Sequence, residues 1–195
     1  MSDIGINNQK TVSSLFNTDG TSYKIFGDRP PTLIFIHGVG MCDEIWAPQV
    51  EYFSKKYQVI TYDFLGHGQS PLSKNEPTLD DYVEQLNNLV DTIGVSNFSL
   101  VGHSMGAIIS VAFARKFPLK VNALVPLNIV FNRSKKAQKD VLMRANQILE
   151  SNKILNIEKT LERWFKNNVS PSELNKIDKV RSWLKNTSPK GYGED

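Results

Sequence analysis

Phe98-Ser-Leu-Val-Gly-His-Ser-Met-Gly-Ala107 joins an apolar, β-rich run to a segment of small residues, and this stretch decides the fold. Residues 98–101 have the composition of a buried strand, and residues 104–117 have that of a helix that lies close to a sheet. The motif between them, GHSMG at 102–106, matches G-x-S-x-G, in which a sharp strand-to-helix turn exposes a serine hydroxyl. We therefore predict that Ser104 is a nucleophile at such a turn. The alternative is an ordinary glycine-rich turn.

Similar apolar runs lie on both sides of this stretch, at 32–36, 57–62 and 121–125. Two earlier runs, 11–16 and 22–26, flank turn residues and predict a hairpin. Residues 79–93 place apolar side chains at helical spacing, with Thr78 and Asp81 set for a capping box and Gly94 for a left-handed end. Strands that alternate with helices predict an α/β fold with a mostly parallel sheet and flanking helices.

The pattern changes after Phe131, where strand signals stop and helical signals follow at 141–149, 157–165 and 174–184. Polar breaks separate them at 167–172 and 188–193. We therefore predict an α/β core over residues 1–131 and a helical cap over residues 132–190. Residues 133–190 contain 14 Lys and Arg against 6 Asp and Glu, a net charge of +8, whereas the rest of the chain has 9 against 14, or −5.

Two further glycine-rich segments follow strand-like runs. The first is HGVG at 37–40, and acyl transfer needs two N–H donors for the oxyanion. We predict that the backbone N–H groups of Val39 and Met105 supply them, the alternative being a tight strand exit with a structural histidine. The second is DFLGHGQS at 63–70. We interpret Asp63 and Ser70 as local hydrogen-bonding residues that shape this loop.

Composition narrows the function further. The chain has 195 residues, of which 40% are hydrophobic and 22% charged, as in globular proteins. Cys42 is the only cysteine, which excludes an internal disulfide. The net charge of +3 predicts no nucleic-acid binding, and no apolar run approaches the about 18 residues of a membrane span. Residues 1–10 lack the features of a signal peptide, so we expect a cytoplasmic location. No cofactor or metal motif is recognised.

The three motifs at 37–40, 63–70 and 102–107, in this order, resemble those of the α/β-hydrolase superfamily. Together with the phrases TLERWF at 160–165 and SPKGY at 188–192, they are similar to the branch of 3-oxoadipate enol-lactonases and carboxylesterases. The resemblance implies a serine hydrolase of small-molecule carboxylic esters, lactones or thioesters. It also implies that an acyl-enzyme forms on Ser104, with the Val39 and Met105 N–H groups as the oxyanion hole.

In that superfamily the nucleophile is followed along the chain by an acid and then by a histidine. Here His37, His67 and His103 all precede Ser104, and the segment after the sixth strand offers Asn128 and Asn132. We therefore expect the last strands, the triad acid and the triad histidine to be missing, which would leave this fragment inactive. The alternative is a non-catalytic hydrolase fold that binds a ligand.

The basic cap predicts an anionic substrate, because positive charge over a cleft raises the local concentration of anions. Arg163 and Trp164, within TLERWF, are our predicted substrate-binding residues, and Arg133 and Arg144 are further candidates. The alternative is a set of solvated surface charges.

Overall fold

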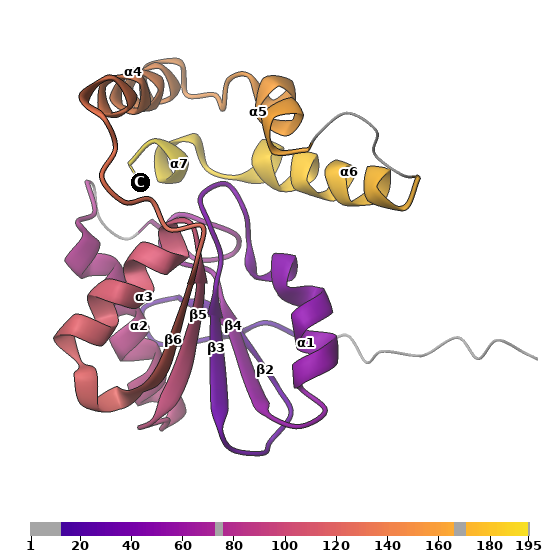
Figure 1. Ribbon diagram of the computed structural model, residues 1–195, viewed down its shortest axis with the longest axis vertical. Coiled ribbons are helices and arrows are strands. Elements are labelled where there is room, and N and C mark those ends of the chain that lie inside the picture. Colours follow the sequence, from indigo (N-terminus) through magenta and orange to yellow (C-terminus); the bar gives the residue numbers. More distant parts are fainter. Residues whose placement is uncertain (1–12, 73–75, 166–170, 195) are drawn as a thin grey trace, which may run out of the picture.

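The computed structural model describes residues 13–72, 76–165 and 171–194, and a six-stranded sheet forms their centre (Figure 1). In space the order is β1-β2-β4-β3-β5-β6. Strands β3 to β6 run parallel, and β2 joins β4 antiparallel. The strands are β1 Leu15–Phe16, β2 Ser22–Phe26, β3 Thr32–Ile36, β4 Gln58–Tyr62, β5 Phe98–His103 and β6 Val121–Leu127.

Helices cover both faces of the sheet. On one face lie the 3₁₀ helix η1 (Asp43–Trp46) and α1 (Ala47–Phe53), over a core built around Phe35, Trp46 and Val59. On the other lie α2 (Leu79–Ile93) and α3 (Met105–Lys116), and η2 (Pro118–Lys120) leads from α3 into β6 (Figure 1). This three-layer arrangement is the predicted α/β fold with a mostly parallel sheet.

The local predictions for the α/β part are largely confirmed. The run at 32–36 is β3, and β1 and β2 form the predicted hairpin, although residues 11 and 12 lie outside the described residues. Helix α2 has the capping box of Thr78 and Asp81, and Gly94 ends it at φ 77°. Strands β5 and β6 extend beyond the predicted ends because their pairing continues to His103 and Leu127. Helix α1 was not predicted.

Four helices stand over the carboxyl ends of the parallel strands, and we call them the cap (Figure 1). They are α4 Lys135–Ser151, α5 Ile157–Trp164, α6 Pro171–Asn186 and α7 Pro189–Glu194. Leu161, Val180 and Leu184 form a small apolar core between α5 and α6. Among the described helices, none is both long and apolar enough to cross a bilayer.

The polar break predicted at 188–193 is wrong, because α7 occupies it. Its two glycines disfavour an isolated helix, but tertiary contact favours the helix here. A Cβ built on Gly191 would lie 2.3 Å from the carbonyl oxygen of Gly66, so only glycine lets α7 lie this close to the loop after β4. The other predicted break falls partly on residues 167–170, which lie outside the described residues, and α6 begins at Pro171.

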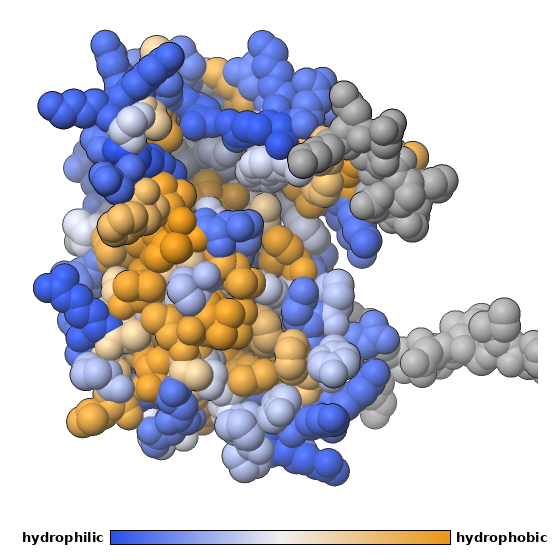
Figure 2. Space-filling model, viewed as in Figure 1, coloured by the Kyte–Doolittle hydropathy of each residue, from blue (hydrophilic) through white to orange (hydrophobic). Residues whose placement is uncertain are grey.

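The outer edge of the sheet is apolar and exposed. Within the described residues β6 pairs with β5 alone, and Val125 and Leu127 keep 43% and 40% of their surface exposed. Figure 2 shows apolar side chains gathered over the body of the molecule, beneath a largely hydrophilic cap. An exposed apolar strand is a template for pairing with another chain.

We predict that the chain of residues 1–195 self-associates through β6. Replacing Val125 with Lys should shift the protein toward monomer in size-exclusion chromatography with light scattering, because a charged side chain on an edge strand opposes pairing. Leu119→Lys, which adds the same charge at a site 92% exposed in η2, should leave the association unchanged. A monomeric wild-type chain would contradict this prediction.

Candidate active site

Ser104 stands in a strained turn between β5 and α3. Its backbone has φ 54° and ψ −114°, a combination that side-chain-bearing residues rarely adopt. The Ser104 N–H donates to the carbonyl of Leu127 at 2.9 Å, and the Ser104 carbonyl accepts from the Ala107 N–H at 3.0 Å. These bonds tie the turn to the end of β6 and to the start of α3, and so hold the strained conformation.

The start of α3 lies directly against the end of β3. A Cβ built on Gly106 would approach the carbonyl oxygens of Ile36 and His37 to 2.3 and 2.4 Å, so residue 106 must be glycine. This contact brings the first turn of α3, with the Met105 N–H, beside the loop that carries Val39. An oxyanion hole needs two N–H donors converging beside the nucleophile. A helix N-terminus also favours negative charge.

His37 and His67 hold the loops around this turn. The His67 Nε2 accepts from the Gly40 N–H at 2.9 Å, and its Nδ1 lies 3.2 Å from the Leu65 carbonyl. The His37 Nδ1 lies 2.9 Å from the Gly38 carbonyl, and its Nε2 accepts weakly from the Phe64 N–H at 3.4 Å. Burial lowers the pKa of His37 to about 4 and that of His67 to about 3, so both rings are neutral near pH 7.

The interpretation of Asp63 and Ser70 as loop-shaping residues is confirmed. The Asp63 carboxylate accepts from the backbone N–H groups of Asp43 at 2.8 Å and Gln69 at 2.9 Å. The Ser70 hydroxyl donates to the Asp63 carbonyl at 2.6 Å and accepts from the Ser22 N–H at 2.9 Å. Burial, and then the charge of Asp43, raise the pKa of Asp63 to about 6.

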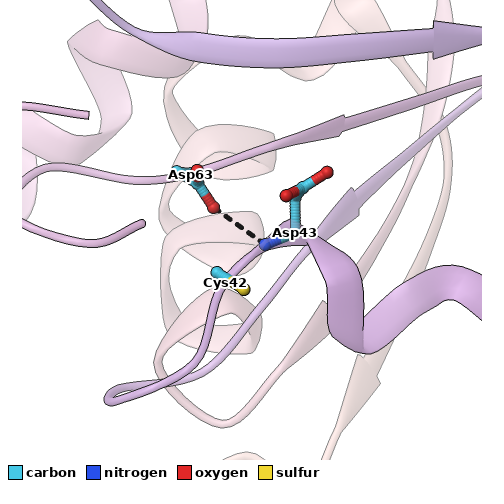
Figure 3. Close-up of side chains that lie close together, drawn as sticks. All are labelled: Cys42, Asp43 and Asp63. Carbon is cyan, nitrogen blue, oxygen red and sulfur yellow. Dashed lines mark hydrogen bonds between the residues drawn. The ribbon is translucent and has the colours of Figure 1, made fainter. Parts of the chain in front are cut away.

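Cys42, Asp43 and Asp63 bring potential metal-binding atoms within 4.8 Å of one another (Figure 3). Protein donors already occupy these carboxylates, however. Asp43 accepts from the Lys24 ammonium at 2.9 Å and from the Thr61 hydroxyl at 3.1 Å, and Asp63 accepts the two N–H bonds described above. Burial also raises the pKa of Cys42 to about 12, which keeps the thiol protonated. The cluster therefore fits a structural role better than a metal centre.

A cavity of about 590 Å³ opens between the cap and the carboxyl ends of β3, β5 and β6. Ser104, Val39, Arg163 and Trp164 all line it, so four of the predicted site residues meet there. The side chain of Met105 instead packs toward the core, which leaves its backbone N–H as its contribution. The described lining consists of Gly38, Val39, Met41, Ile45, His103, Ser104, Asn128, Arg163, Trp164, Phe165 and Val180.

Of the three cap arginines considered, Arg163 lines this cavity, whereas Arg133 and Arg144 are absent from its wall. Within the described ranges, Arg163 makes no ion pair. By contrast Arg181, also in the cap, pairs with Glu158 and Asp178.

His103 and Asn128 line the same cavity, which sequence reasoning did not foresee. The Asn128 Nδ2 lies 3.4 Å from the His103 Nε2. The available signal was that Asn128 directly follows β6, whose end is in register with the end of β5.

Comparison with known proteins identifies the family. The profile of the alpha/beta hydrolase fold matches residues 31–188, which is most of the chain. The chain belongs to the α/β-hydrolase fold family. The three relatives described next are hydrolases by name, which agrees with the superfamily resemblance of the motifs.

Three relatives illustrate the similarity. The (E)-2-((N-methylformamido)methylene)succinate hydrolase of Acinetobacter baylyi is 38% identical over 180 residues, which cover 91% of this chain and 66% of that protein. The enol-lactonase of Burkholderia xenovorans LB400 superposes with a TM-score of 0.77 at 25% identity, covering 89% of this chain and 68% of its own. A hydrolase from Pseudomonas aeruginosa PA01 superposes with a TM-score of 0.76 at 25% identity, covering 96% of this chain and 72% of its own. The match thus spans about two thirds of the Acinetobacter protein.

Because His37 and His67 are buried and neutral, we predict that the folded protein loses stability in acid. The unfolded chain protonates His37 and His67 near pH 6.5, whereas the folded chain resists protonation down to about pH 4 and 3. Their contribution to the free energy of unfolding is therefore complete above pH 6.5 and is lost as the pH falls. Between about pH 6 and 4 the folded chain binds a proton at Asp63, because the pKa of Asp63 is raised. This proton offsets one of the two that the unfolded chain binds at the histidines.

Urea unfolding of wild type and His67→Gln at pH 7, 6 and 5 tests this. Below pH 6 the free energy of unfolding of the variant should fall by about 1.4 kcal/mol less per pH unit than that of wild type. The reason is that one proton-binding site has been removed from the unfolded chain. Equal slopes in the two proteins would contradict the assignment of His67 as a buried neutral ring.

Proposed function

We propose that the whole protein is a serine hydrolase that cleaves a carboxylic ester, lactone or thioester bond in a small substrate bearing a carboxylate. One observation carries the proposal: the same cavity is lined by a serine in a strained strand-to-helix turn and by an arginine that forms no ion pair with the described residues. The relatives support it, since the name of one gives a succinate derivative as its substrate and that of another describes an enol-lactonase.

In the proposed reaction the Ser104 hydroxyl attacks the substrate carbonyl. The N–H groups of Met105 and Val39 stabilise the oxyanion, and the leaving group departs as the acyl-enzyme forms. Water then releases the acid. Among the described residues, Met41, Ile45 and Phe165 give the cavity wall a largely apolar surface against which the substrate chain can pack.

Ser104 needs a general base to react at neutral pH. The rings of His37 and His67 are buried and engaged in loop contacts, and the Nδ1 of His103 is buried with no partner within the described residues. We therefore propose that the base and its orienting acid belong to a part of the whole protein that corresponds to regions of the relatives this chain does not match.

Arg163 is proposed to bind the substrate carboxylate. A guanidinium presents paired N–H donors that match the two oxygens of a carboxylate. Trp164 lies beside it on the cavity wall and offers an apolar surface for the substrate chain. The net charge of +8 over residues 133–190 would further attract anions to the opening.

The test compares a carboxylate-bearing aryl ester with its neutral isostere on the whole protein, at low and high salt. We expect kcat/KM for the anionic ester to exceed that for the neutral one about tenfold at low salt, and less at high salt. Arg163→Ala should remove this advantage, whereas Arg133→Ala, a cap arginine away from the cavity, should retain it. Ser104→Ala should lower turnover of both esters by about 10⁴-fold or more.

Two outcomes would contradict the proposal in different ways. Equal rates for the two esters at low salt would overturn the carboxylate site. Unchanged turnover in Ser104→Ala would overturn Ser104 as the nucleophile.

A further inference from the structure

The cavity beside Ser104 has few polar side chains. Of the described residues that line it, these are Ser104, Arg163, His103 and Asn128, and the others are apolar or glycine. In a mostly apolar site, a few placed polar groups fix the orientation of the ligand. Ser104 and Arg163 have proposed roles, which leaves His103 and Asn128 to be explained.

We propose that Asn128 is a specificity-determining residue that donates a hydrogen bond to an uncharged carbonyl oxygen of the substrate, while Arg163 binds the carboxylate. The substrate class is then a small carboxylic acid that also carries an amide or ester carbonyl. This inference rests on the proposed function, because it takes the carboxylate at Arg163 as given.

The backbone fixes Asn128 relative to the nucleophile. Leu127, the residue before it, accepts the Ser104 N–H at 2.9 Å and is in register with His103 across the β5–β6 pair. Asn128 is therefore held next to the strained turn by strand pairing. Arg163, in contrast, reaches the same cavity from α5 of the cap.

His103 orients the amide of Asn128. Burial lowers the pKa of His103, so its ring is neutral near pH 7. The Asn128 Nδ2 lies 3.4 Å from the His103 Nε2. In this proposal the Nε2 is unprotonated and accepts one N–H of the Asn128 amide. A side-chain amide has two N–H donors. The second remains for a ligand, and His103 is a positioning residue that acts through Asn128.

The Asn128 amide is an uncharged donor, so it selects substrates with a hydrogen-bond acceptor and does not require a second negative charge on them. A ligand that lacks the acceptor leaves the amide N–H unpaired in the cavity, and an unpaired buried donor lowers affinity. Selection by Asn128 is therefore expected to separate two carboxylates of equal length that differ in a carbonyl group.

The backbone of Asn128 also permits clean variants. Asn128 and Asn132 both adopt left-handed conformations, with φ 49° and 51°. Glycine adopts this region without strain, and Asp tolerates it nearly as well as Asn. Asn128→Gly removes the donor, Asn128→Asp replaces it with an acceptor, and Asn132→Gly is a matched control outside the cavity wall.

The experiment measures binding in the Ser104→Ala background, so that it does not depend on hydrolysis. The probes are N-acetyl-β-alanine, which has a carboxylate and an amide, and hexanoate, which has the same chain length with two methylenes in place of the amide. Ligand-observed NMR titration gives the two dissociation constants. We expect N-acetyl-β-alanine to bind about fivefold more tightly, the size of one hydrogen bond.

Asn128→Gly and Asn128→Asp should both abolish this preference, and Asn132→Gly should keep it. His103→Phe should lower the preference between the two ligands, whereas a general loss of structure would weaken both ligands alike. Arg163→Ala should weaken both ligands equally.

Three results would overturn the inference. If both probes bind the Ser104→Ala protein equally, Asn128 has no such role, although the carboxylate site stands. A preference that persists in Asn128→Gly leads to the same conclusion. If neither probe binds, the carboxylate site of the proposed function fails, and this inference fails with it.

Discussion

The first turn of α3 lies so close to the end of β3 that no side chain fits between them, and the site depends on this approach. Gly106 fills the contact, because any Cβ there would collide with the carbonyls of Ile36 and His37. With the helix held at that distance, the chain between β5 and α3 must turn sharply at one residue. Ser104 takes the strained conformation, at a cost of about 1–3 kcal/mol, and its hydrogen bonds to β6 and α3 help to offset it.

Buried polar side chains then support the loops that surround the turn. His67 joins the loop after β3 to the loop after β4 through the Gly40 N–H, and Asp63 joins the same two loops through the Asp43 and Gln69 N–H groups. These groups are used for structure and are thereby withdrawn from catalysis. The polar groups that we propose to face the ligand come from elsewhere in the fold: Arg163 from the cap and Asn128 from the end of β6, which both line the cavity.

Much of the fold and the turn at Ser104 could be predicted from the sequence, because glycines in a motif indicate where backbones approach closely. The G-x-S-x-G motif predicted the turn at Ser104, and the apolar runs predicted β3 to β6. Periodicity could not rank Arg163 above Arg133 and Arg144, because that choice depends on which way each cap helix faces. The pairing of His103 with Asn128, 25 positions apart, depends on strand register. Helix α7 was missed because contacts with α4 and Gly66 outweigh the low helix propensity of its two glycines.

The central claim is that Ser104 attacks the substrate carbonyl. The most direct measurement is mass spectrometry of the whole protein quenched during turnover of an activated aryl ester, followed by peptide mapping. The account predicts an added acyl mass on the peptide that contains Ser104, with no such adduct in Ser104→Ala. Turnover without an acyl adduct, or an adduct carried by another residue that persists in Ser104→Ala, would contradict it.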